Sequence, residues 1–387
     1  MQLIKRRERL GEYAFYIGIA IHLILMTIGY GDYRIPFQGR FMHLAFVLLG
    51  IKIVTTYYSK TEWAVMAILG CIGALSYVAT GDEYVVSVLV MILAAKNADM
   101  RRVCKWILML VLVFTLVIAV LSLLGVGGTP VDIRDYGRGG IESRWCLGFG
   151  HANNLHGTVW YIVAMAVYLF FERLNWKHYL MLSLFNVILF CFTVSKGGVI
   201  ATQIVIIAAM TLRYISKLEQ QTWIYICGFL GILSVIVISM ISVSVQWTES
   251  EILMFLDRIF TGRINLAYQH ANANMWKWLS SAGELGDAVD NGWVTIFFYY
   301  GYIIGIVFIL FQFYLIYRTW KEKNGILLVI VVTCAFYTFM EATYTMNNAY
   351  LLCNLSYITA MILLAEKKGI VNGRKEVKRN SHSNVSL

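Results

Sequence analysis

The stretch that decides the fold is WILMLVLVFTLVIAVLSLLG, which runs from Trp106 to Gly125. It contains no charged residue, and it comes just after Arg101, Arg102 and Lys105. About 20 apolar residues are enough for an α-helix to cross the hydrocarbon core of a bilayer. Basic residues at one end of such a run are typical of its cytoplasmic end. The stretch therefore predicts a membrane-spanning helix.

The composition of the whole chain agrees with this local pattern. Of the 387 residues, 59% are hydrophobic and only 14% are charged, and the mean hydropathy is +0.68. Soluble domains carry about a quarter charged residues, so the composition excludes a soluble enzyme, a disordered protein and a disulfide-rich scaffold. It also argues against a nucleic-acid binder, despite the net charge of +10. We expect an all-α, polytopic integral membrane protein.

Twelve apolar segments are candidates for membrane-spanning helices. They cover residues 13–29, 41–57, 63–79, 84–95, 106–125, 155–172, 179–194, 197–212, 223–245, 291–317, 326–343 and 349–365. Some are short, so we expect about twelve transmembrane helices. We expect residues 1–365 to form one transmembrane domain, followed by a basic cytoplasmic tail at 366–387 that can contact anionic lipid.

The basic residues predict the orientation of the chain. If both termini are cytoplasmic, 23 of the 32 Lys and Arg residues fall in inner segments and 9 in outer segments. Such an excess follows the positive-inside rule and supports an even number of spans. Two long loops, at about 126–154 and 246–290, then lie on the outer side. Long loops of this kind are usually functional or disordered.

The basic residues on the outer side are the informative ones, because the positive-inside rule does not explain them. They are Arg34, Arg40, Arg134, Arg138, Arg144, Lys196, Arg258, Arg263 and Lys277. The guanidinium group suits bidentate binding of phosphate. The bland alternatives are an incidental Arg144 before a capped helix, and lipid-phosphate anchors for Arg258 and Arg263.

The first outer loop ends in the sequence RWCLGFGHANN, from Arg144 to Asn154. Its glycines allow the backbone to approach a ligand closely, and the helix that follows presents an N-terminus that favours anions. Arg144 and Asn153 are therefore candidate binding residues, and His151 is a candidate base. A simple capped helix start remains the alternative, and we expect His156 to be a packed or interfacial residue.

The second outer loop contains Asp257, Arg258 and Arg263, and its helical spacing from about 251 to 280 predicts an amphipathic helix on the membrane surface. The loop ends at Asp290 and Asn291, before an apolar helix. Asp290 is either a helix cap, which its position alone favours, or a carboxylate that faces the arginines.

Two further residues lie near the same predicted surface. The turn Ser195-Lys-Gly-Gly198 places Lys196 there, and Glu341 is an acid late in the eleventh apolar segment. Ionisable groups inside a membrane are candidates for function, although Glu341 can equally reach the interface. Together the outer residues suit an anionic ligand such as phosphate. Transport of an anion is the alternative, but cations inside the predicted spans are scarce.

The ordered motifs resemble those of a known family. The motifs are Arg144-x-x-x-Gly-Phe-Gly-His-Ala-Asn153, Ser195-Lys-Gly-Gly198, Gly262-Arg263, Asp290-Asn291-Gly-Trp-Val and Tyr300-Gly-Tyr-Ile-Ile-Gly305. In order and spacing they resemble the Wzy-type O-antigen polymerase family, to which the O-antigen ligases are related. The resemblance covers residues 140–305 in motifs and the whole chain in topology. Ala152 stands where the family often has proline, and Asp290 stands where ligases typically have histidine, which favours the polymerase.

The resemblance implies an oligosaccharide repeat-unit polymerase in the bacterial plasma (inner) membrane. Such a glycosyltransferase joins repeat units carried on undecaprenyl pyrophosphate into capsular, exopolysaccharide or O-antigen chains at the outer face. A chain-length regulator and a repeat-unit flippase are the implied partners. Two alternatives remain open, namely a ligase-like transferase of finished glycan, and a transporter or flippase of a lipid-linked or anionic substrate.

The resemblance also implies a role for each candidate residue. The expected binders of pyrophosphate or substrate are Arg144, Arg258, Arg263, Lys196, Asn153 and Asn291. The expected bases for the acceptor hydroxyl are Asp290 first, His151 second and Asp257 third. The outer loops contain no Asp-x-Asp motif and the cysteines show no metal-ligand spacing, so we expect neither a metal nor another cofactor.

Overall fold

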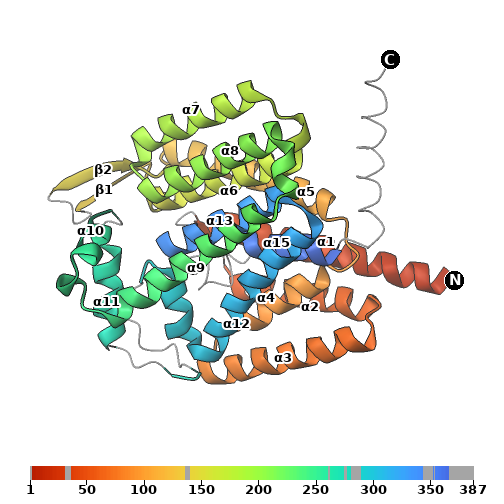
Figure 1. Cartoon of the computed structure of the whole chain (residues 1–387). Coiled ribbons are helices and arrows are strands. Elements are labelled where there is room, and N and C mark those ends of the chain that lie inside the picture. The colour runs from red at the N-terminus through yellow and green to blue at the C-terminus, as the bar shows by residue number, and fades with distance from the viewer. Residues whose placement is uncertain are drawn as a thin grey trace, which may run out of the picture.

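The computed structural model of the chain is a bundle of α-helices with a small β-hairpin at one end (Figure 1). It describes residues 2–30, 36–135, 140–259, 262–273, 277–279, 289–342, 352 and 354–365. The predicted cytoplasmic tail at 366–387 lies outside the described residues.

The helices follow one another along the chain with short connections, apart from the two long loops. The α-helices are α1 (Gln2–Tyr30), α2 (Gln38–Thr55), α3 (Lys60–Thr80), α4 (Tyr84–Ala94), α5 (Met100–Leu123), α6 (Ala152–Phe170), α7 (Trp176–Thr193), α8 (Lys196–Tyr214), α9 (Thr222–Ser244), α10 (Glu251–Ile259), α11 (Arg263–Ala273), α12 (Gly292–Glu322), α13 (Gly325–Met340) and α15 (Leu355–Ala365). Short 3-10 helices lie at Phe171–Arg173, Ser216–Gln220 and Trp247–Glu249.

Each of the twelve predicted apolar segments overlaps one of these helices, so the protein is a helical, polytopic membrane protein as expected. The number of spans is not confirmed. Within the described residues, seven helices are long and apolar enough to cross a membrane by length and composition. They are α3, α5, α6 with the 3-10 turn after it, α7, α8, α9 and α12. The shorter apolar helices are α4, α13 and α15.

The bundle has a buried centre and an apolar outer surface. Helix α6 is largely buried, whereas α3 and α7 expose most of their apolar side chains. Trp160 of α6 stacks on Tyr337 of α13, with 4.8 Å between the ring centroids, and both rings are fully buried. In a bilayer the exposed apolar faces contact lipid, so the buried helices α6 and α13 form the rigid centre that carries the site.

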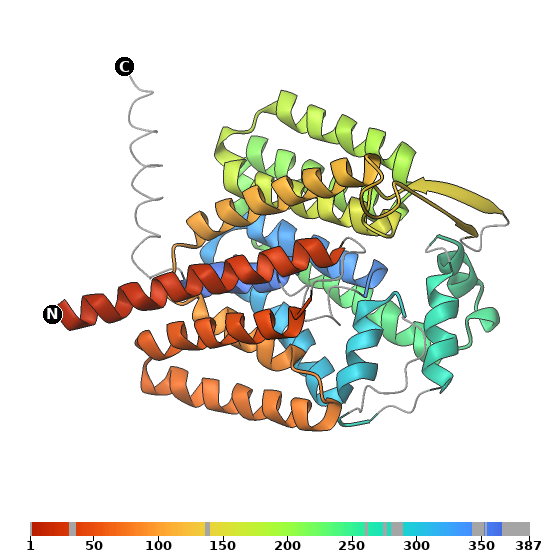
Figure 2. The ribbon, with the colours of Figure 1, turned by 180° about the vertical axis from the view of Figure 1, so that it is seen from behind.

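The first long loop forms an antiparallel hairpin of β1 (Val131–Asp135) and β2 (Ile141–Trp145), which the all-α expectation did not include. The second contains α10 and α11 instead of the expected single helix. The helix ends because Gly262 adopts a φ of +83°, which a side chain disfavours. Figures 1 and 2 show both loops at one end of the bundle, opposite the N-terminal end of α1.

Helix α12 is broken at Gly301, where the second loop returns to the bundle. The φ of Gly301 is +83°, and a Cβ there would lie 2.6 Å from the carbonyl oxygen of Trp278. The freed backbone N–H groups donate instead to this loop, from Tyr302 to the Lys277 oxygen at 3.0 Å and from Ile303 to the Trp278 oxygen at 3.3 Å. Backbone groups freed in a membrane helix need such partners.

Candidate functional site

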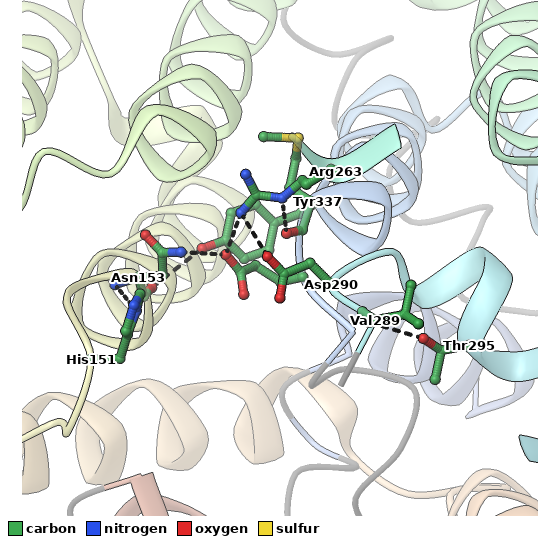
Figure 3. Close-up of polar contacts among 9 residues, drawn as sticks. His151, Asn153, Arg263, Val289, Asp290, Thr295 and Tyr337 are labelled. Carbon is green, nitrogen blue, oxygen red and sulfur yellow. Dashed lines mark hydrogen bonds and ion pairs between the residues drawn. The ribbon is translucent and has the colours of Figure 1, made fainter. Parts of the chain in front are cut away.

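Polar side chains from four separate parts of the chain meet around Arg263 (Figure 3). Its Nη2 atom lies 3.3 Å from Oε1 of Glu341 and 3.5 Å from Oδ2 of Asp290. Its Nε donates a hydrogen bond of 3.0 Å to the carbonyl oxygen of Met340. Asn153 donates from Nδ2 to the same Oε1 of Glu341, at 2.7 Å. We call Asn153, Arg263, Asp290 and Glu341 the Arg263 cluster.

Every member of the Arg263 cluster stands at the end of a helix. Asn153 lies in the first turn of α6, and Arg263 is the first residue of α11. Asp290 comes two residues before α12, and Glu341 directly follows the last residue of α13. Helix ends offer unsatisfied backbone groups and a change of chain direction. The cluster therefore forms where these four elements meet at the end of the bundle that carries the long loops.

The cluster holds one cation between two carboxylates that differ in exposure. The side chain of Glu341 is 16% exposed, and that of Asp290 is 45% exposed. Burial raises the pKa of Glu341 from 4.5 to about 7, Arg263 opposes this rise, and the charge of Asp290 adds to it. Glu341 is thus the inner carboxyl, and Asp290 is the one that a substrate can reach.

His151 is the N-cap of α6, and its Nδ1 accepts a hydrogen bond of 3.1 Å from the backbone N–H of Asn153. Burial lowers the pKa of His151, Arg134 lowers it further, and Asp132 and Asp290 act against both. The ring is therefore neutral at pH 7 and carries its proton on Nε2. In this state its free edge donates a proton, which fits the role of a base less well than Asp290 does.

Arg144 lies on β2 and is 2% exposed. Its Nε donates to Oε2 of Glu142 at 2.9 Å, and it faces Asp132 across the hairpin. Among the described contacts, the structure thus pairs Arg144 within the hairpin and not with the Arg263 cluster. Its charge still lowers the pKa of His151, so the histidine lies between the hairpin and the cluster.

The turn with Lys196 packs tightly against the same region. Lys196 is the exposed first residue of α8. A Cβ at Gly197 would lie 3.1 Å from Met340, the residue whose carbonyl oxygen holds Arg263, and a Cβ at Gly198 would lie 2.5 Å from the ring of His156. The two glycines therefore let α8 approach α6 and α13, and this approach brings Lys196 toward the cluster.

His156 itself is a packed residue, as expected. It is fully buried, and its ring nitrogens lie 2.8 Å from Oγ1 of Thr193 and 3.0 Å from Oδ1 of Asn186. It belongs to the contacts that join α6 to α7.

The structure does not bring Asp257 and Arg258 into the cluster. Asp257 is buried, and its Oδ1 accepts the backbone N–H of Asn265 at 2.9 Å. This contact joins α10 to the first turn of α11, which suits a structural role better than the predicted role of a base. Arg258 is exposed on α10, beside the exposed apolar side chains of Phe255 and Ile259. Such a surface fits the predicted contact with lipid phosphate equally well.

Asn291 and Asp290 divide the two roles that their position allowed. Asn291 is the N-cap of α12, because its Oδ1 accepts the N–H of Trp293 at 3.0 Å. Its Nδ2 donates to Oγ of Ser239 at 3.0 Å, and its side chain is buried. Both ends of this amide are used within the fold, so its predicted contact with substrate has no support in this geometry. Asp290 is not the cap, and it faces Arg263.

Glu341 is the member of the cluster that sequence reasoning left out of the predicted site. Its signal was an acid at the end of an apolar segment, and that signal alone did not separate a functional acid from one that reaches the interface. Only the contacts of Glu341 with Arg263 and Asn153 make the distinction.

Within the described part of the chain, no group of three or more His, Cys, Asp or Glu side chains is placed to hold a metal ion. No protein-family model, curated protein sequence or solved structure matches the chain.

Proposed function

We propose that this chain is a membrane glycosyltransferase of the repeat-unit polymerase type. It joins oligosaccharide units carried on undecaprenyl pyrophosphate into capsular, exopolysaccharide or O-antigen chains at the outer face of the bacterial plasma membrane. The Arg263 cluster is the observation that carries this proposal. Asn153, Arg263 and Asp290 come from three of the motifs on which the family resemblance rests, and they meet at one end of the bundle.

The cluster has the groups that the reaction needs. A hydroxyl oxygen of the acceptor forms a bond to the anomeric carbon of the donor chain. The bond from that carbon to the diphosphate oxygen breaks, and the diphosphate leaves with the electron pair. A preorganised cation stabilises the charge that develops on the leaving group, and a carboxylate within hydrogen-bond reach accepts the hydroxyl proton. Arg263 suits the first role and Asp290 the second.

Other cations of the same end can contribute to diphosphate binding. Lys196 is exposed at the start of α8, next to the glycine that packs on Met340. Arg258 is exposed on α10, in the second loop. Arg144 lies farther from the reacting groups in this proposal, because Glu142 already pairs with it. Its part is to help to keep His151 neutral.

The surroundings of the cluster suit substrates that are anchored in lipid. The helices below it expose apolar side chains along their length, and α10 exposes Ile252, Phe255 and Ile259 beside Arg258. An amphipathic helix of this kind lies well at a bilayer surface. A polyprenol chain can remain in the hydrocarbon while its diphosphate reaches the end of the bundle.

Analysis of lipid-linked glycans in a strain that lacks the gene tests the proposal. We expect single repeat units to accumulate on the lipid and long chains to disappear. Finished long chains that remain on the lipid would instead indicate a ligase. Unchanged polymer length would refute a role in polymerisation.

Complementation of the same strain tests the site. Arg263→Ala and Asp290→Asn should fail to restore long chains, although both variants should reach the membrane. Glu322→Gln is the matched control, because Glu322 pairs with Arg318 four residues earlier at the other end of α12. It should restore chains of normal length.

A further inference from the structure

The charges in the Arg263 cluster do not balance when both of its carboxyls are ionised. Arg263 supplies one positive charge, whereas Asp290 and Glu341 supply two negative charges within 3.5 Å of its Nη2 atom. The cluster is then negative, although the substrate that it is proposed to meet is an anion. A like charge held a few ångströms away weakens binding of an anion, especially where little water screens the interaction.

Glu341 is the carboxyl that can remove this excess charge. It is the less exposed of the two, and burial disfavours its ionised form. Its Oε1 already accepts hydrogen bonds from Asn153 and Arg263. Those contacts persist when Oε2 carries a proton, so protonation changes the charge of the cluster without dismantling its geometry.

We propose that Glu341 binds a proton when the diphosphate of the lipid-linked donor binds at Arg263, so that the substrate meets a neutral cluster. This inference rests on the proposed function. Asp290 remains ionised and keeps its role as the acceptor of the hydroxyl proton. Glu341 is therefore a positioning residue that couples binding of the anionic donor to uptake of one proton, and it takes no direct part in bond making.

Other groups near Glu341 do not supply the same proton. They are Arg263 on α11, Asp290 before α12, His151 and Asn153 at the start of α6, Tyr337 on α13 and Lys196 at the start of α8. The lowered pKa of His151 keeps its ring neutral around and above pH 7. The raised pKa of Glu341, about 7, places its titration in that range.

Binding of P1,P2-dimethyl diphosphate tests the inference. This probe has the same diester linkage as the lipid-linked donor, and it does not itself titrate near neutral pH. Affinity is measured with the full-length protein in detergent, from about pH 6 to about pH 9. For the wild type we expect affinity to fall by up to about tenfold for each pH unit above about pH 7.

The variant Glu341→Gln is permanently neutral and keeps an oxygen that accepts from Asn153 and Arg263. Its affinity should stay independent of pH, at the level that the wild type reaches at low pH. Glu322→Gln, which alters an Arg–Glu pair far from the cluster, should follow the wild type. A purely structural Glu341 would leave the two pH profiles parallel, and parallel profiles would overturn the inference.

Calorimetry of the wild type in two buffers with different ionisation enthalpies gives a second measurement that needs no variant. At about pH 8 we expect uptake of about one proton for each bound probe. Binding without proton uptake would overturn the inference and leave the proposed function intact. Failure of the probe to bind to the wild type and to Glu341→Gln at every pH would instead refute the diphosphate site itself.

Discussion

Replacement of Arg263 by alanine tests the charge balance of the cluster through the stability of the fold. The substitution removes the cation that lies 3.3 Å from Glu341 and 3.5 Å from Asp290, together with the hydrogen bond to Met340. Loss of one partner from a buried ion pair costs about 3–5 kcal/mol when the other partner stays charged. Glu341 can escape part of that cost, because its pKa of about 7 lets it take up a proton.

The direction of the pH dependence follows from this pKa. The folded protein holds the proton of Glu341 more tightly than the unfolded chain, where the carboxyl has its ordinary pKa of 4.5. This contribution to stability is complete at low pH, and it is lost as the pH rises through the folded value. Arg263 opposes the rise in the pKa, so its removal raises the pKa further and makes the loss steeper.

The expected cost of Arg263→Ala therefore depends on pH. At about pH 6 we expect a loss of about 1 kcal/mol in the free energy of unfolding, mainly from the hydrogen bond to Met340. Above about pH 7 the loss should increase by up to about 1.4 kcal/mol for each pH unit. Thermal unfolding midpoints of the full-length protein in detergent measure both effects.

The double variant Arg263→Ala with Glu341→Gln isolates the cause. It should unfold at a midpoint that varies much less with pH than that of Arg263→Ala alone. Arg318→Ala removes the cation from the pair with Glu322 and serves as the control, and it should show no such increase around pH 7. An equal loss of stability at every pH in Arg263→Ala, or a double variant with an undiminished pH dependence, would refute the reasoning.

Three further substitutions test the catalytic group and the packing around it. Asp290→Asn should slow polymerisation by about 10²–10⁴-fold, the usual contribution of a general base, with an unchanged unfolding midpoint; normal chain lengths would rule Asp290 out. Gly198→Ala should destabilise the protein by about 1–3 kcal/mol, because its Cβ would lie 2.5 Å from the ring of His156, whereas Gly70→Ala has open space and should be neutral. Gly301→Ala should release the second loop, since its Cβ would lie 2.6 Å from a loop carbonyl oxygen, and proteolysis of that loop should then become faster.

The helices could be predicted from the sequence because their cause is local. Hydrogen bonds within each helix link residues four positions apart, and the apolar runs are long enough to be recognised singly. The turn that carries Gly198 and the helix start at His151 were also visible as short motifs. The hairpin was missed, since the alternation from Val131 to Asp135 is brief and its partner strand lies beyond a gap in the chain.

The assignment of roles to neighbouring residues needed the tertiary structure. Asp290 and Asn291 are both good helix caps, and only the packing of α12 on Ser239 of α9 decides that Asn291 is the cap. Asp257 was an equally plausible carboxylate in the same loop, but the turn at Gly262 directs it to the backbone of α11.

The amino-acid order thus determined a helical membrane protein with two long loops at one end, because length and hydropathy of each segment suffice for that conclusion. It did not determine which side chains of those loops meet. Asn153, Arg263 and Glu341 are separated by many residues, and their contacts depend on how α6, α11 and α13 pack side by side. Packing over such separations is a property of the whole bundle, so the pairing of one guanidinium with two carboxyls was decided only in three dimensions.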